Sequence, residues 1–378
     1  MELMSQLVSF LSSGKSDFHV CNYRSTSMLK MTKRQLSFDL VKMAMMLWVV
    51  WGHLGLYGIV ESEPLTLMHN AKIGVNMPVF FVMSGYFAAS AFSKSGWPKV
   101  LARSVYYVWP HVTLPILCAV FWLLAGDDSL RTVLGHLPFY WFLRILAIVY
   151  LLCAAIYKLA ATDKMRWFLF VLVYMVMFFC PQIFHWWWCD QVIHMYPYFV
   201  FGLMVLRRHA FFNNAVVSIV CGALYLLAVI FQGDSTSNGM NFWKVCAYWD
   251  VVLFNIRDIV TFFARTVVGI TGSVFIIFFA ELLSRFVPHV NRLAPLGRTS
   301  LGIYVLHEYP LSFIGCHLGF LPMPAWSRWI VAIGWFLVCH FAVRLVQCSK
   351  VCRFLVFGDE AWIQNILAKW LSCLRRRE

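Results

Sequence analysis

The stretch DLVKMAMMLWVVWGH, residues 39–53, is apolar enough for a buried helix, yet it contains the ionisable side chains of Asp39, Lys42 and His53. Each of these groups leaves water at a cost when such a helix is buried. Successive helical residues turn by about 100° and rise by about 1.5 Å. Lys42 and His53 therefore lie within about 20° of one face and about 16 Å apart, and Asp39 falls on the same stripe. We expect one wall of this helix to carry a cation and an imidazole separated by about half a bilayer.

The composition of the chain indicates an all-α, polytopic membrane protein. Of its 378 residues, 61% are hydrophobic and 13% are charged, and the mean hydropathy is +0.72. A soluble globular chain of this length is far less apolar. Apolar runs of about twenty residues, long enough to cross the hydrocarbon as helices, recur along the chain. The ten predicted spans cover residues 37–57, 72–92, 105–125, 138–157, 167–187, 192–206, 211–231, 259–283, 300–318 and 328–348.

Basic residues predict how these spans are oriented. The chain has 31 Lys and Arg against 17 Asp and Glu, and its net charge is +14. Most Lys and Arg fall in segments that share one side when the spans alternate, and the positive-inside rule makes that side the cytoplasm. Because the number of spans is even, both termini are predicted to be cytoplasmic. The predicted units are an N-terminal tail over 1–36, a transmembrane domain over 37–348 and a C-terminal segment over 349–378.

The C-terminal segment has the pattern of an amphipathic helix at the membrane surface. Ile363, Leu367 and Trp370 recur at helical spacing, and three consecutive arginines follow. The bilayer is therefore a predicted partner, whereas nucleic acid is not, because no soluble domain presents a groove. The twelve cysteines form no CxxC pair. We expect them to pack as small apolar residues, and no metal site is predicted.

Six motifs along the chain resemble the integral-membrane acyltransferase family 3 in their order. They are FDLVKMAMMLWVVWGH at 38–53, MPVFFVMSGYF at 77–87, RSVYYVWP at 103–110, WFLRILAIVYLL at 141–152, YPYFVFGLMV at 196–205 and LGRTSLGIYVLHE at 296–308. The resemblance covers roughly residues 35–345. The family hallmark is a basic residue, usually Arg, ten intervening positions before a His; here Lys42 and His53 keep the spacing. Lys at that place, with the second motif, is similar to the fucose 4-O-acetylase-like subgroup of polysaccharide O-acetyltransferases, some of which carry His where Asn76 stands.

The resemblance implies an O-acyltransferase of the bacterial cytoplasmic membrane. It implies transfer of an acyl group, most often acetyl, from acetyl-CoA as co-substrate to a hydroxyl of a carbohydrate or glycolipid acceptor, with no permanently bound cofactor. His53 is the predicted catalytic base, since imidazole accepts a proton near neutral pH; structural hydrogen bonding is the alternative role. Direct transfer and an acyl-His intermediate both remain open. Asp39 is predicted to pair with Lys42 at i+3, either to orient it or to act with it in catalysis.

Basic residues near the inner ends of two spans are candidates for binding the donor. Lys42 in the first span, with Lys99 and Arg103 at the start of the third, would hold the phosphates of acyl-CoA. The pantetheine arm would then run along the shared wall toward His53. The alternatives are a snorkelling anchor for Lys42 and a topology signal for Arg103.

Five further polar residues within spans are candidates for binding substrate. His307 and Glu308 place an imidazole beside an acid in the ninth span, where a proton relay, a sugar contact and a structural network are all open. Ser84 and Tyr86 lie in the second span, where close helix packing is the favoured interpretation. Arg144 is an additional charge within the fourth span.

Two other classes of protein fit the same features. A transporter or flippase for a glycan or small solute would line its path with intramembrane His and Arg. A catalytically idle relative would serve as an assembly scaffold. Consumption of acetyl-CoA without any gradient separates the enzyme from the transporter.

Overall fold

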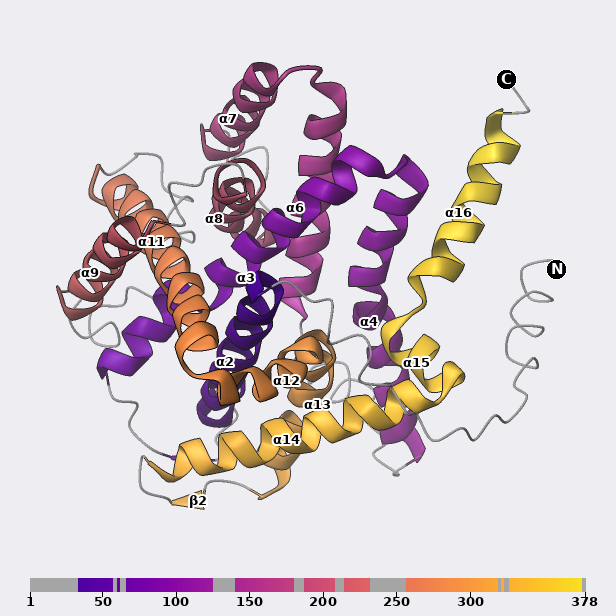
Figure 1. The fold of residues 1–378 in the computed structure, drawn as a ribbon. Coiled ribbons are helices and arrows are strands. Elements are labelled where there is room, and N and C mark those ends of the chain that lie inside the picture. The colour runs from indigo at the N-terminus through magenta and orange to yellow at the C-terminus, as the bar shows by residue number, and fades with distance from the viewer. Residues whose placement is uncertain are drawn as a thin grey trace.

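The computed structural model describes residues 33–56, 60–61, 66–124, 140–179, 187–207, 214–231, 256–318, 321–322 and 326–375. Nearly all of these residues are helical, which confirms the predicted all-α class (Figure 1). The first 32 residues of the predicted N-terminal tail lie outside this description. The described helices are α2 (Lys33–Leu56), α3 (Thr66–Lys94), α4 (Trp97–Leu124), α6 (Trp141–Leu159), α7 (Asp163–Phe179), α8 (Trp187–Val200), η3 (Phe201–Leu206), α9 (Ala215–Phe231), α11 (Ile256–Phe286), η6 (Pro288–Leu293), α12 (Ala294–Arg298), α13 (Ser300–Leu318), α14 (Ser327–Cys348), α15 (Lys350–Phe357) and α16 (Glu360–Arg375).

Each predicted span coincides with a helix within the described part of the chain. Four helical segments there are long and apolar enough to cross a membrane, by length and composition: Gly74–Lys94, Trp141–Leu159, Phe263–Phe286 and Ser327–Cys348. The sixth predicted span is α8 followed by the short π-helical segment η3, and Pro197 lies inside α8. Pro removes a backbone donor and disturbs the regular helix, which accounts for an irregular path here. The number of spans and the orientation of the termini stay predictions.

Helix α3 lies at the centre of the bundle and contacts α2, α6, α8, α9, α11 and η3. Its closest crossing is with α8 and η3, through Gly85 and Gly202. A Cβ atom on Gly85 would lie 2.0 Å from the backbone oxygen of Phe199, and one on Gly202 would lie 1.9 Å from that of Val82. The missing side chains let the two backbones touch, as predicted for the SGY sequence.

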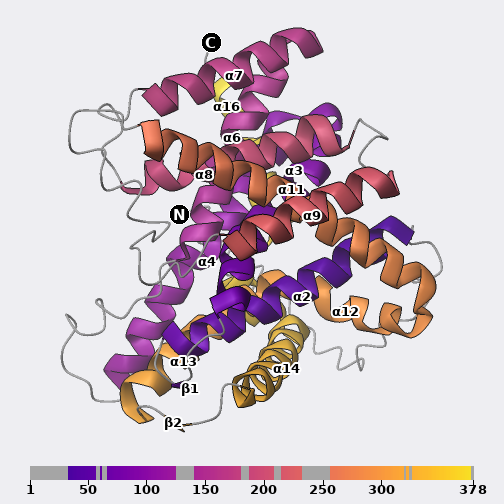
Figure 2. The same cartoon turned by 90° about the vertical axis from the view of Figure 1, so that its left-hand side faces the viewer.

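Helix α2, which carries the stretch 39–53, packs against α11, α12, α13 and α14. In Figure 1, α14 crosses below α2 and α12, and α13 lies against it. Two short strands, β1 (Val60–Glu61) after α2 and β2 (Leu321–Pro322) after α13, pair in parallel, with Val60 opposite Leu321. Figure 2 shows this pair beside α13.

Large apolar side chains are exposed on several described helices. On α14, Ile330, Val338 and Phe341 are each more than half exposed, and α9 shows a similar face. Exposed apolar surfaces of this kind mark membrane or partner contact rather than contact with water. They agree with a location in the membrane.

The C-terminal segment forms two helices, α15 and α16, and not only the single amphipathic helix predicted. Gly358 separates them with a positive φ of 76°, a backbone conformation that favours glycine. The side chain of Ser349 caps the start of α15, and that of Asp359 accepts a hydrogen bond from the backbone nitrogen of Trp362 at 2.9 Å to cap α16. Helix α16 packs along α4 (Figure 1).

Candidate active site

A cavity of about 580 Å³ opens between α2, α3, α4, α6, α12, α13 and α16. Ligand sites in proteins fall in the same range of about 300–1,000 Å³. Its lining combines basic side chains with an apolar and aromatic wall. The lining residues are Lys42, Met46, Met77, Phe80, Met83, Ser84, Phe87, Ala88, Ser90, Ala91, Lys99, Arg103, Tyr107, Phe142, Leu146, Tyr150, Arg298, Ser300, Leu301, Tyr304 and Glu360.

All three residues predicted to bind the donor line this cavity. Lys42 comes from α2, and Lys99 and Arg103 come from the first turns of α4. A fourth cation, Arg298 at the end of α12, lines the same cavity and was assigned only to topology by its sequence position. Its place within the motif at 296–308, directly after a glycine, is the sequence signal that could have identified it.

The carboxylate of Asp39 connects two of these cations. Lys42 Nζ donates to Asp39 Oδ1 at 3.0 Å, which is the pairing predicted from the i+3 spacing. Arg298 Nε donates to Asp39 Oδ2 at 3.2 Å. A Cβ atom on Gly297 would lie 1.7 Å from the backbone oxygen of Asp39, so the glycine allows α12 to approach α2 closely enough for this bond. The buried carboxylate thereby fixes Lys42 and Arg298 at one wall of the cavity.

On the opposite side of the cavity, Arg103 is held by side chains of α4 and α16. Its Nε donates to the hydroxyl of Tyr107 at 3.3 Å, and its guanidinium lies 5.7 Å from the centre of that ring. It also forms an ion pair with the carboxylate of Glu360. Glu360 was not predicted as a site residue, because its contact with α4 joins positions 257 apart.

A half-buried histidine and a fully buried one meet deeper in the bundle. His53 Nδ1 lies 2.7 Å from His307 Nε2, and the two rings are nearly parallel, with an angle of 6° between their planes. His307 is fully buried and its Nδ1 lies 2.8 Å from the backbone oxygen of Tyr304 and 3.1 Å from that of Ile303.

These contacts determine where the protons of a neutral pair lie. A carbonyl oxygen only accepts, so Nδ1 of His307 must carry a hydrogen, and its Nε2 is then an acceptor. Nδ1 of His53 therefore donates to His307, which makes Nε2 the basic nitrogen of His53. A base oriented by a second group in this way is the arrangement that general-base catalysis uses.

The pair of histidines lies next to the cavity and not in its lining. Tyr304 lines the cavity. Its ring centre is 5.7 Å from that of His307, and His307 follows Tyr304 by about one turn of α13. Lys42 thus faces the cavity directly, whereas His53 contacts His307 behind the wall that Tyr304 forms. The shared face predicted for Lys42 and His53 therefore leads from the cavity toward the histidine pair.

A buried cation, Arg328 of α14, holds the turn of α2 that carries His53. Its Nε donates to the backbone oxygen of Trp51 at 3.0 Å, and a second nitrogen to that of Gly52 at 3.4 Å. Its guanidinium lies 4.4 Å from the centre of the Trp51 ring. Cations favour helix C-termini, so this contact stabilises the end of α2. Arg328 was not predicted as a site residue, although an Arg at the edge of an apolar span is itself a signal.

The five predicted substrate-binding residues are distributed over different environments. Ser84 lines the cavity. Tyr86 packs instead on Phe38, with ring centres 5.0 Å apart. His307 binds His53, and Glu308 is buried beside it in α13. Arg144 lies in α6 and is absent from the described lining of the cavity.

The described residues hold no group of three His, Cys, Asp or Glu side chains that could bind a metal ion.

The fold and the site together define the class of the protein: it is a helical membrane protein with a cationic cavity beside an oriented histidine. The chain belongs to acyltransferase family 3: the family's sequence model, described as an acyltransferase domain, matches residues 35–345. This match confirms the predicted family and supports an acyltransferase. No curated protein and no solved structure matches the chain. The matched region ends before α15 and α16 begin.

Proposed function

We propose that the protein is a multi-pass O-acyltransferase of the bacterial cytoplasmic membrane that moves an acyl group, acetyl in the first instance, from acyl-CoA to a hydroxyl of a cell-surface glycan or glycolipid. The observation that carries this proposal is the convergence of four cations on one cavity whose wall leads to the His53–His307 pair. The membership of an acyltransferase family supports the enzyme over the transporter.

The cavity suits the two chemically different parts of a coenzyme A thioester. Phosphate groups require cations, and Arg103 and Arg298 offer forked donors while Lys42 and Lys99 offer point charges. The long pantetheine arm requires an apolar channel with few charges. Methionine and aromatic side chains of α2, α3 and α6 supply that surface, and methionine adapts well to irregular ligands.

The reaction that the histidine pair supports is a proton-coupled acyl transfer. Nε2 of His53 removes the proton of an acceptor hydroxyl as its oxygen attacks the thioester carbonyl. The carbon–sulfur bond then breaks, and the proton passes from His53 to the departing thiolate. His307 keeps His53 in the required tautomer throughout. An acyl-His53 intermediate is the alternative: Nε2 would form a bond to the acyl carbon as the carbon–sulfur bond breaks, and the acceptor oxygen would then displace Nε2 from that carbon while its proton passes to the thiolate.

The decisive test is mass spectrometry of surface glycans from cells that express the protein or its H53A variant. Acetylation should appear with the native protein and disappear with H53A. The matched control is H289A, which removes an exposed histidine of η6. Full acetylation by H53A, with the variant present in the membrane in normal amount, would refute the role of His53.

Purified protein in nanodiscs provides the second test. The proposal requires slow consumption of acetyl-CoA, or its binding, without any ion gradient. Transport of a glycan with no binding of acetyl-CoA would favour the transporter instead.

A further inference from the structure

The proposed donor cavity has one wall that the matched acyltransferase region does not contain. Glu360 is the first residue of α16, beyond residue 345 where the match ends. Its carboxylate nevertheless lines the cavity and forms an ion pair with Arg103. The C-terminal helices therefore contribute directly to the electrostatics of this cavity.

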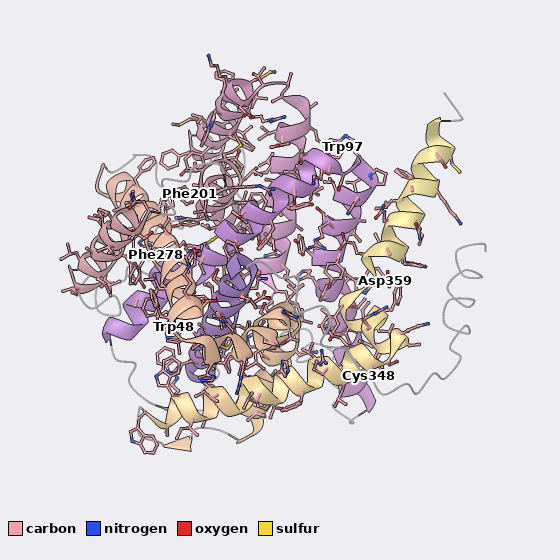
Figure 3. All side chains as sticks on the ribbon, viewed as in Figure 1. Trp48, Trp97, Phe201, Phe278, Cys348 and Asp359 are labelled. Carbon is pink, nitrogen blue, oxygen red and sulfur yellow. The ribbon has the colours of Figure 1, made fainter. Side chains whose placement is uncertain are left out.

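Several contacts fix Glu360 in this position. The Trp109 ring of α4 packs against Phe354 of α15 and Trp362 of α16, with ring centres 5.1 Å and 6.4 Å apart. The indole nitrogen of Trp109 also donates to the backbone oxygen of Phe354 at 2.8 Å. Asp359, labelled in Figure 3 where α16 begins beside α4, caps the helix in which Glu360 stands. This junction holds the start of α16, and with it the backbone of Glu360, next to the cavity.

We propose that Glu360 is an affinity-determining residue that competes with the phosphates of the donor for Arg103. This inference rests on the proposed function, because it assumes that the cavity binds an acyl-CoA. A carboxylate and a phosphate offer a guanidinium the same kind of acceptor oxygens. Arg103 already gives one nitrogen to Tyr107 and another to Glu360. A donor phosphate that binds Arg103 must share this guanidinium with Glu360, and it is also repelled by the fixed negative charge.

The exposure of the pair makes such competition feasible. The side chains of Arg103 and Glu360 are 44% and 26% exposed. Ion pairs with this much contact with water contribute little to stability and are screened by salt. A polyphosphate that also binds Lys42, Lys99 and Arg298 can therefore replace Glu360 at Arg103. The C-terminal helices would thus set the concentration of donor at which the cavity fills.

Binding of acetyl-CoA to full-length protein in nanodiscs tests the proposal. The E360Q variant keeps the shape of the side chain and removes its charge. We expect it to bind acetyl-CoA about two- to fivefold more tightly at low salt, with a smaller gain at high salt. The matched control is D359N, which removes an equal charge one residue away, outside the cavity lining, and retains a capping side chain. It should bind like the native protein.

The R103A variant separates this inference from the proposed function. R103A should bind acetyl-CoA more weakly, and adding E360Q to it should bring a smaller gain than in the native protein, because the contested cation is gone and only the repulsion by Glu360 is removed. Unchanged or weaker binding by E360Q, an equal gain in D359N, or a gain that is as large without Arg103 would overturn the role of Glu360 while leaving the donor site intact. Equal binding by native protein and R103A would also overturn the role of Glu360, whereas no binding in any variant would overturn both proposals.

Discussion

Replacing His307 tests whether the histidine pair acts in catalysis or only in packing. The H307L variant removes the nitrogen that accepts from His53 Nδ1–H. That nitrogen lies 2.7 Å from His53 Nδ1 on a fully buried side chain, and leucine replaces the ring with an apolar side chain of similar size. Losing a buried hydrogen bond costs about 1–3 kcal/mol. At about 1.4 kcal/mol for each factor of ten in rate, kcat should fall between about fivefold and about 150-fold. The KM for acetyl-CoA should stay the same, because His307 does not line the cavity.

The assay is steady-state release of coenzyme A from acetyl-CoA by protein in nanodiscs, with glycan acceptor extracted from the host membrane. The H307Q variant is the matched comparison, since its amide offers both an acceptor for His53 and donors for the two carbonyl oxygens. It should recover part of the lost kcat. An H307L protein with native kcat, or one altered only in KM, would show that His307 does not orient the base.

Three further predictions concern the cavity and its support. R298A should raise the KM for acetyl-CoA severalfold, as one phosphate-binding cation is lost, whereas R292A at an exposed position outside the cavity lining should not. D39A should lower the melting temperature, because it leaves two cations without their shared carboxylate at a cost of about 1–3 kcal/mol; a native melting curve would contradict this. G85A should lower the free energy of unfolding by about 3 kcal/mol or more, because the new methyl group would lie 2.0 Å from a backbone oxygen. In the control G334A the methyl group meets nothing within 4 Å, so this variant should keep native stability in a detergent unfolding assay.

The sequence was sufficient to predict the helices, because each apolar run of about twenty residues has one stable form in a membrane. It also predicted the local pairing of Asp39 with Lys42, since three positions along a helix face the same way. Lys42, Lys99 and Arg103 were predicted to lie together, and they line one cavity, because spans that alternate in direction bring corresponding ends together.

Contacts between distant helices were beyond prediction from periodicity. His53 and His307 are 254 positions apart, and Asp39 and Arg298 are 259 apart. A hydropathy pattern states which face of a helix is apolar but not which other helix covers it. His307 was therefore assigned to substrate, and Arg298 and Glu360 were not assigned to the site at all.

The pairing of β1 with β2 links the segment that follows α2 to the segment that follows α13. These two helices carry the imidazoles of His53 and His307. A strand pair beyond the ends of the helices therefore resists a relative rotation or sliding that would separate the two rings. Inserting residues between α2 and β1, or between α13 and β2, would weaken this restraint without changing a side chain of the site. For the proposed proton transfer, this strand pair beyond the two helices then matters in addition to the histidines themselves.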